Sequence, residues 1–273
     1  MCRWLAYSGA PLAIEELVFN TTHSLIEQSR HAREAETTTN ADGFGIGWYG
    51  NRERPGIYRS VLPAWNDHNL HEVAHQVESP LFLAHVRAAT GTPVQETNCH
   101  PFRYGNWLFV HNGIVRELGK VRRELLLAVD SEIFLNIHGT TDSEVLFHLA
   151  LTFGLREEPL RALERMAGFV ETVGRKAGVE APIQMSLGIS DGQRIYGVRY
   201  SSERESNSLF HTRAVSDLRE DFPPVSRYSD DARALVSEPL TDNLVPWVEV
   251  PESTALIIEK GEGQSLPFAS RQP

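Results

Sequence analysis

The sequence predicts an α+β fold, in which antiparallel sheets carry helices on their outer faces. Strand-like segments follow one another through hairpin signals, of which Asp191-Gly192 between two apolar runs is the clearest. The order of segments also lacks the regular alternation of strands and helices that a parallel sheet requires. Because the 273 residues contain no internal repeat and no low-complexity linker, we expect one domain over residues 1–273.

The expected strands are short apolar runs bounded by turn residues. Residues 2–7 form the first run, which is expected to end at Ser8-Gly9. The glycine-dense residues 43–47 indicate a loop that enters a strand. Further strands are expected at residues 81–87, 106–111, 185–190, 194–200 and 255–259. The second of these should end in a turn at Asn112-Gly113, a common turn dipeptide.

Helices are expected where apolar residues recur with helical spacing, at residues 11–20, 116–129, 143–153 and 159–173. His68, His71 and His75 also share one face of a helical segment over residues 67–77. No carboxylate or cysteine completes an obvious zinc shell there, so we interpret the segment as a polar helix face and expect no metal. Residues 223–231 and the last residues are expected to be irregular.

The chain carries a net charge of −10 and has a pI of about 5.6. Nucleic acids and anionic membranes require a basic surface, so we expect neither as a partner. No apolar run approaches the ~18 residues of a transmembrane helix, and the first residues do not resemble a signal peptide. Two cysteines cannot form a disulfide framework, so a reducing cytoplasm is the expected compartment.

Cys2 is the most informative residue, because it directly follows Met1. Removal of Met1 would place a thiol and a free α-amino group on the same residue. A free α-amino group titrates near ~7.7–8.0, so part of it is neutral at physiological pH and can serve as a base. The thiol could then attack a carbonyl group while the amine transfers the proton.

Two further segments could bind the head group of an α-amino acid. Arg87 ends a buried strand, and its planar guanidinium suits a carboxylate, to which Thr90 can add a hydroxyl group. Asp142 precedes a predicted helix and could hold an ammonium group. Each residue alone has a simpler reading, since Arg87 could form a surface ion pair and Thr141 or Asp142 could cap the helix. Together they fit the carboxylate and the amine of one substrate.

Asn112 and Gly113 could stabilise the charge that develops when a carbonyl group is attacked. An asparagine amide and a backbone N–H can cradle an oxyanion, and glycine permits close approach. The same dipeptide is more often only a turn. Combined with Cys2 and an amino-acid head group, it favours a substrate with a side-chain amide, which describes glutamine or a γ-glutamyl compound.

Eight motifs follow one another along nearly the whole chain, at residues 1–7, 40–48, 63–65, 85–90, 98–102, 111–113, 141–144 and 237–240. With these motifs the chain resembles the class II glutamine amidotransferases, the family with an N-terminal cysteine nucleophile. It is most similar to the stand-alone bacterial type, which has no fused synthase domain. The resemblance implies a four-layer αββα sandwich of the N-terminal-nucleophile hydrolase type.

The resemblance also implies the catalytic roles. Cys2 would be the nucleophile with its own amine as base, and Asn112 and Gly113 would form the oxyanion hole. The thiol would take the γ-glutamyl group from an amide, and water would release it from the thioester. No cofactor is implied.

The substrate-binding roles follow in the same way. Arg87 would bind the substrate carboxylate with support from Thr90, and Asp142 would bind the substrate amine. Some synthase-linked members carry a histidine directly after the threonine, where this chain has Gly91. Details of how those members close over their substrate therefore do not transfer to this chain.

Three functions remain open at this stage. The first is a glutamine amidotransferase that passes ammonia to a synthase partner. The second is a hydrolase of a γ-glutamyl peptide or conjugate in thiol metabolism. The third is a non-catalytic regulatory or binding subunit, which the retained site residues disfavour. The sequence indicates neither the leaving group nor the oligomeric state.

Overall fold

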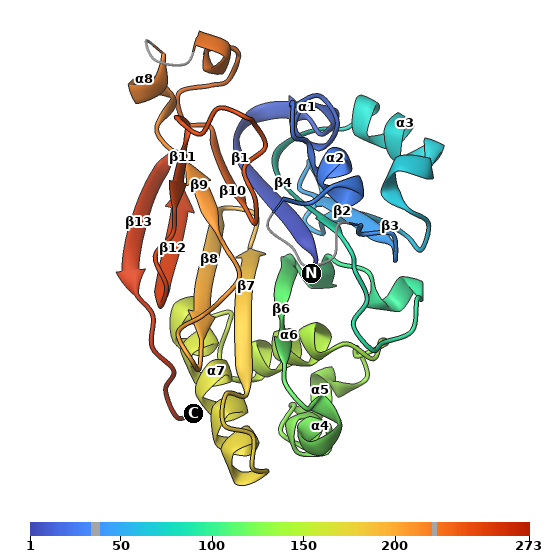
Figure 1. The fold of residues 1–273 in the computed structure, drawn as a ribbon, viewed down its shortest axis with the longest axis vertical. Helices are drawn as coiled ribbons and strands as arrows, with labels where there is room; N and C mark the ends of the chain where they lie inside the picture. Colours follow the sequence, from blue (N-terminus) through green and yellow to red (C-terminus); the bar gives the residue numbers. More distant parts are fainter. Residues whose placement is uncertain (34–38, 220–222) are drawn as a thin grey trace.

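The computed structural model describes residues 1–33, 39–219 and 223–273. Two antiparallel sheets face each other, and helices cover their outer faces (Figure 1). The first sheet has the order β11 (Trp247–Glu249), β9 (Phe210–Thr212), β10 (Arg233–Val236), β1 (Arg3–Ala13), β4 (Glu78–Val86), β2 (Phe44–Trp48), β3 (Gly56–Ser60). The second sheet has the order β13 (Glu262–Pro267), β12 (Thr254–Glu259), β8 (Arg194–Ser201), β7 (Ile183–Ser190), β6 (Trp107–Val115), β5 (Phe102–Tyr104).

The helices divide between the two outer faces according to which sheet they bury. The first sheet packs against α1 (Glu15–Val18), α2 (Leu25–Arg30), α3 (His68–Gln76) and the short α8 (Val215–Leu218). The second sheet packs against α4 (Leu118–Leu127), α5 (Ser131–Phe134), α6 (Asp142–Thr152) and α7 (Pro159–Lys176). In the described ranges no helix combines the length and the apolar character needed to cross a bilayer.

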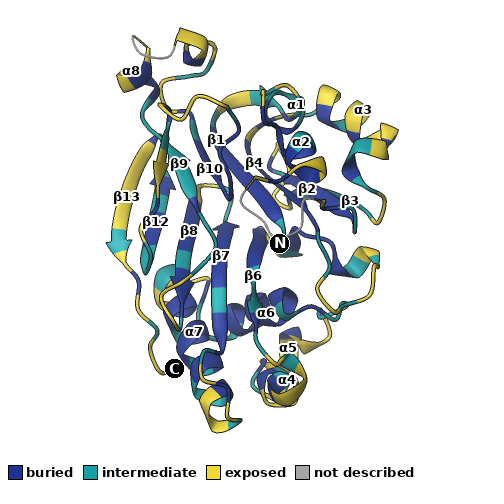
Figure 2. Cartoon of the chain, viewed as in Figure 1, coloured by how far each residue is buried: buried dark blue, intermediate teal, exposed yellow. Residues whose placement is uncertain are grey.

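Alternating side chains along the strands build three apolar layers. In β1, Trp4 packs between the two sheets, whereas Leu5 packs against the helices of the first sheet. In β6, Val110 packs between the sheets and Phe109 against the helices of the second sheet. Figure 2 shows the result, with buried positions along the central strands and exposed ones on α3, α4 and β13. The predicted α+β class and the four-layer αββα sandwich are both confirmed.

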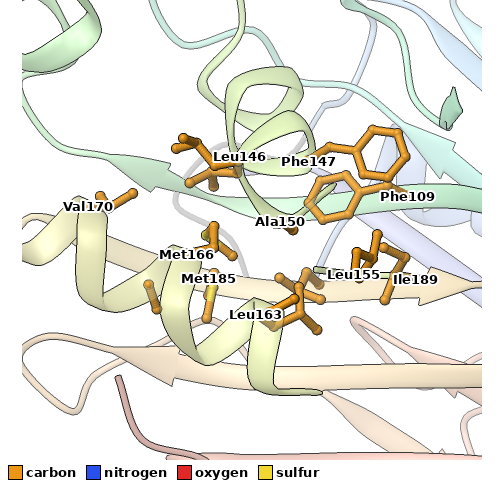
Figure 3. Close-up of a cluster of buried hydrophobic side chains, with 14 of the residues drawn as sticks. Phe109, Leu146, Phe147, Ala150, Leu155, Leu163, Met166, Val170, Met185 and Ile189 are labelled. Atoms are coloured by element: carbon orange, nitrogen blue, oxygen red, sulfur yellow. The ribbon is translucent and has the colours of Figure 1, made fainter. Parts of the chain in front are cut away.

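Helix α6 packs against β6 of the second sheet and against the neighbouring helices α4 and α7. Phe147 of α6 stacks on Phe109 of β6, with ring centroids 5.3 Å apart (Figure 3). Met166 and Val170 of α7 complete the same cluster. The helix is buried from Ser143 to Leu151, so its first turn is held rigidly at one end of the second sheet.

The first strand is longer than the sequence predicts. β1 continues past Ser8-Gly9 to Ala13, because its second half pairs with the start of β4 after an irregularity between Ser8 and Leu12. The helix expected at residues 11–20 is therefore only the four residues of α1. Backbone pairing with a neighbouring strand here outweighs the helical spacing of the apolar residues.

One other predicted feature was wrong, one strand was not predicted, and one hairpin is confirmed. Asn112 and Gly113 do not form a turn, because they lie inside β6, where Asn112 pairs with Ser186 of β7. Residues 262–267, where the sequence analysis predicted no strand, form β13 at the edge of the second sheet, and the residues after them have no regular structure, as expected. Most of β13 is exposed, as an edge strand that faces solvent can be. The hairpin at Asp191-Gly192 is confirmed and joins β7 to β8.

Candidate active site

A cavity of about 510 Å³ opens beside the start of β1, a volume typical of small-molecule sites. The loop after β4, the end of β6 and the first turn of α6 form its walls. Figure 1 marks the amino terminus near β6, where these elements meet. Five of the predicted site residues line the cavity: Cys2, Arg87, Thr90, Gly113 and Asp142.

Cys2 is partly buried, and its thiol donates one hydrogen bond. Its Sγ donates to the carbonyl oxygen of Ala88 at 3.6 Å. Burial raises the pKa of the thiol, although the positive charge of Arg87 opposes this effect. The structure retains Met1, so the nitrogen of Cys2 is an amide here and cannot act as a base. A thiol with a raised pKa needs a separate base before it can attack.

Arg87 is anchored by a residue to which the sequence analysis assigned no role. Its Nη1 donates to the carbonyl oxygen of Asp42 at 3.2 Å, and its Nη2 donates to Thr92 Oγ1 at 2.6 Å. The Asp42 carboxylate also accepts the N–H of Ala89 at 2.8 Å. These contacts shape the loop after β4 and orient the guanidinium, while Thr90 lies exposed at the rim of the cavity. Asp42 resembles an ordinary turn residue in the sequence, and only the fold brings it to Arg87.

Asn112 is buried next to the cavity and does not line it. Its Oδ1 accepts a hydrogen bond from Asn207 Nδ2 at 3.1 Å, which leaves its own amide N–H groups to donate. Trp4 Nε1 donates to the carbonyl oxygen of Ser186, the residue that pairs with Asn112 across β6 and β7. The start of β1 thus lies against this part of β6. No sequence signal distinguished Asn207 from other loop residues.

Gly113 is required by the close packing of the strands. A Cβ atom at this position would lie 2.1 Å from the carbonyl oxygen of Gln184 and 2.4 Å from His111 Nε2. Both distances are far below the 3.0 Å that real Cβ atoms essentially never undercut. Only glycine therefore fits here without moving β6 away from β7.

Asp142 is the first residue of α6, and its carboxylate faces the cavity. The helix cap is Thr141, whose side chain accepts the N–H of Glu144. Asp142 instead accepts the N–H of Ser143 at 2.7 Å and the N–H of Val115 at 2.8 Å. Of the two residues expected as possible caps, Thr141 is therefore the cap and Asp142 is not. Its fixed, negatively charged carboxylate can hold an ammonium group.

Three buried histidines cluster at the cavity, where His100 and His111 form part of the wall and His85 lies behind them. His85 stacks on His100 with ring centroids 4.1 Å apart, and His111 Nδ1 lies 2.8 Å from Ser143 Oγ. Burial lowers the pKa of all three, to about 3 for His85 and well below its ordinary value for His100. These imidazoles are neutral at pH 7, and His85 and His100 are weak bases.

Cys99 and the histidines of residues 67–77 lie outside the cavity wall. Cys99 is fully buried, and burial raises the pKa of its thiol to about 11. His75 contacts Glu15 at 2.9 Å, and His71 packs edge-on against Phe19. Across residues 1–33, 39–219 and 223–273, no group of three or more His, Cys, Asp or Glu side chains is placed to hold a metal ion.

Comparisons with known proteins cover nearly the whole chain. The family profile described as Glutamine amidotransferases class-II matches residues 15–272. The probable glutamine amidotransferase DUG3 of Saccharomyces cerevisiae is 30% identical over 293 residues, which cover 95% of this chain and 82% of that protein. The gamma-glutamyl-hercynylcysteine sulfoxide hydrolase of Mycobacterium tuberculosis is 39% identical over 117 residues, 42% of this chain and 50% of that protein.

Solved structures agree with this assignment. A glutamine aminotransferase class-II domain protein from Silicibacter pomeroyi superposes with a TM-score of 0.74 at 33% identity, covering 98% of this chain and 100% of that chain. The glutamine phosphoribosylpyrophosphate amidotransferase of Bacillus subtilis shares the fold, with a TM-score of 0.67 at 17% identity over 99% of this chain and 50% of that chain. Profile, relatives and fold agree: the chain belongs to the class II glutamine amidotransferases.

Proposed function

We propose that this chain hydrolyses a γ-glutamyl amide through a γ-glutamyl thioester on Cys2. The observation that carries the proposal is one cavity lined by a thiol, a guanidinium and a carboxylate, from Cys2, Arg87 and Asp142. The guanidinium suits the α-carboxylate of an amino acid, and the carboxylate suits its α-amine. The thiol in the same cavity is then available to the side chain of that amino acid.

The amine of Cys2 itself is the base in this proposal. Burial raises the pKa of the thiol, so little thiolate forms without proton removal. Removal of Met1 would free an α-amino group that titrates near ~8 and can accept the thiol proton. His85 and His100 are poorer candidates, because burial lowers the pKa of both.

The reaction follows as two acyl transfers. The Cys2 thiolate adds to the γ-carbonyl carbon, and the amide of Asn112 and the N–H of Gly113 stabilise the oxyanion. The C–N bond then breaks, and the leaving nitrogen takes a proton from the Cys2 ammonium group. Water next adds to the thioester and releases glutamate and the thiol. Loss of one oxyanion donor typically costs ~10²–10³-fold in rate.

Glutamine and γ-glutamyl conjugates are the two candidate substrates. Glutamine would release ammonia, which a synthase partner could accept, and the DUG3 relative is named a probable glutamine amidotransferase. A conjugate is favoured by the mycobacterial relative, which is named a γ-glutamyl hydrolase. A cavity of about 510 Å³ also leaves room beyond a bound glutamine.

The test is a substrate screen on protein whose intact mass has been measured. Glutamine, γ-glutamyl amides and γ-glutamyl peptides are compared by ammonia and glutamate release. Cys2→Ala serves as the blank, and Cys99→Ala is the matched control because its thiol lies outside the cavity wall. Ammonia from glutamine alone favours the amidotransferase, and faster release from peptides favours the conjugate hydrolase. Equal activity of wild type and Cys2→Ala would rule out the proposed mechanism.

We further propose that residues 1–273 act as one domain in the cytoplasm. The core between the two sheets takes side chains from both ends of the chain, including Trp4 and Leu256. Two free thiols, Cys2 and Cys99, suit a reducing compartment.

A further inference from the structure

A buried charged cluster lies directly behind Cys2. The carboxylate of Glu238 accepts hydrogen bonds from Arg3 Nε at 2.7 Å and from His23 Nε2 at 2.5 Å. The backbone N–H of Arg33 donates to the same carboxylate at 3.0 Å. Glu238 is 2% exposed and Arg3 is 1% exposed. Burial alone would raise the pKa of Glu238, but the bond from His23 and the charge of Arg3 lower it to about 2.

Arg3 connects this cluster to the proposed nucleophile. Its Nη1 donates to the carbonyl oxygen of Cys2 at 2.9 Å, while Glu238 holds its Nε. Within the described part of the chain, its Nη2 is buried without a hydrogen-bond partner. A guanidinium taken out of water in this way depends on a nearby counter-ion, and the Glu238 carboxylate supplies it.

The neighbours of Glu238 lock it to the start of β1. Ser237 Oγ accepts the N–H of Trp4 at 2.9 Å, and the N–H of Ser237 donates to the carbonyl oxygen of Trp4 at 3.0 Å. Gln28 Nε2 donates to the carbonyl oxygens of His23 and Glu238 at 3.0 and 3.2 Å. The motif at residues 237–240, to which the sequence analysis assigned no role, thus holds the first residues of the chain.

We propose that Arg3 and Glu238 are positioning residues, which fix the main chain of Cys2 and balance the charge beside its amine and thiol. The inference rests on the proposed function, because it takes Cys2 as the reacting residue. Arg3 fixes the carbonyl group of Cys2, so the amine and the thiol of that residue are left to point toward substrate. Glu238 cancels the charge of Arg3, which would otherwise disfavour the protonated amine and favour the thiolate.

The other charged groups around the thiol come from different elements. Arg87 lies at the end of β4 and Asp142 at the start of α6, and both act on the thiol with opposite effects on its pKa. His100 and His111 stand in the cavity wall and are kept neutral by burial. Loss of the Glu238 charge would therefore leave the cation of Arg3 as the new, uncompensated charge beside Cys2.

The decisive variant is Glu238→Gln, which keeps the shape of the side chain and removes its charge. We expect kcat to fall by about 10- to 100-fold, since small displacements of a reacting group have effects of this size. The KM should stay within about threefold, because Arg87 and Asp142 are untouched. The acid limb of kcat/KM should move down by about one pH unit, because an uncompensated cation lowers the pKa of the nearby amine.

Further variants separate charge from hydrogen bonding. Arg3→Lys keeps the charge but loses the fork that reaches the Cys2 carbonyl oxygen, so kcat should fall while the acid limb stays in place. Removing both charges, by Arg3→Gln with Glu238→Gln, should return the limb to its wild-type position. Glu171→Gln is the matched control, since Glu171 is also buried and ion-paired but lies on α7 against Tyr200. It should lower stability and leave kcat and the pH profile unchanged.

A second readout separates this inference from the proposed function. The rate of Cys2 alkylation by iodoacetamide, followed peptide by peptide, reports thiolate formation without any substrate. The pH at which the alkylation rate is half-maximal should be lower in Glu238→Gln than in wild type and unchanged in Arg3→Lys. If wild type cleaves no γ-glutamyl amide, the function fails while alkylation still tests the inference. The inference would be overturned if Glu238→Gln showed the kcat and the alkylation profile of wild type. It would also be overturned if Glu171→Gln showed the same shift as Glu238→Gln. If Glu238→Gln does not fold, an unchanged kcat in Arg3→Lys would overturn the inference instead.

Discussion

Replacing Gly113 by alanine tests both the packing of the site and its chemistry. The added Cβ would lie 2.1 Å from Gln184 O and 2.4 Å from His111 Nε2, whereas Cβ contacts below 3.0 Å are essentially never seen. Relief of the first contact therefore requires a displacement of about 1 Å between β6 and β7. Inserting an extra methyl group into a packed core forces backbone shifts of this kind. We expect this strain to lower the free energy of unfolding by about 1–3 kcal/mol.

The same displacement should impair catalysis, because it moves a backbone N–H that is proposed to bind the oxyanion. A hydrogen bond near ~2.9 Å that lengthens by this amount is no longer a hydrogen bond. The expected loss is about 10²–10³-fold in kcat, with a smaller change in KM. Steady-state kinetics on the substrate identified by the screen, with urea unfolding of the same preparation, measures both effects.

Gly119→Ala is the matched control. Gly119 lies within α4 and lines the same cavity, but a Cβ there has nothing within 4 Å. Gly119 is the second residue of α4, so alanine there should raise the free energy of unfolding by no more than about 0.5–1 kcal/mol, the value for a helix interior, and leave kcat within about twofold. A Gly113→Ala variant with wild-type kcat would refute the assignment of this N–H to the oxyanion hole.

Three other predictions follow from single contacts. Asp142→Asn removes the charge proposed to hold the substrate amine, so KM should rise by about 10- to 100-fold with little change in kcat; a wild-type KM would contradict that role. Cys99→Ala should keep full activity and lose about 1 kcal/mol of stability, since the buried thiol packs in the interior and forms hydrogen bonds to the carbonyl oxygens of Ser60 and Gln95; a large activity loss would show a chemical role. Burial lowers the pKa of His85 to about 3, so the folded state binds fewer protons than the unfolded chain and loses stability as pH falls below ~6.5. Between pH 7 and 5 the loss should be about 2 kcal/mol for this residue, and a constant urea midpoint over that range would contradict it.

The residue types of the candidate site could be predicted from the sequence because their chemistry is local. A thiol next to Met1, an arginine at a strand end and an Asn-Gly pair each carry their meaning within a few residues. The conformation of that pair could not be predicted in the same way. Asn-Gly favours a turn in isolation, but in β6 it pairs with β7, a strand about seventy residues away.

The supporting contacts depend on elements that meet only in the folded chain. Asp42 orients the loop after Arg87, Asn207 holds the amide of Asn112, and Glu238 neutralises Arg3 across 235 positions of sequence. No spacing rule links such pairs, because their separation is set by the order of strands in the two sheets. The edge strand β13 escaped prediction for a related reason, since its polar residues follow no apolar period and pairing with β12 alone makes them a strand.

The central claim is that Cys2, freed from Met1, carries the acyl group. Acid-quenched mass spectrometry during turnover tests it most directly, with intact mass to show whether Met1 is present and peptide mapping to locate the adduct. We predict an amino terminus at Cys2 and one γ-glutamyl group on its sulfur, absent from Cys2→Ala. Full turnover by protein that retains Met1, or an acyl group on another residue, would contradict the account.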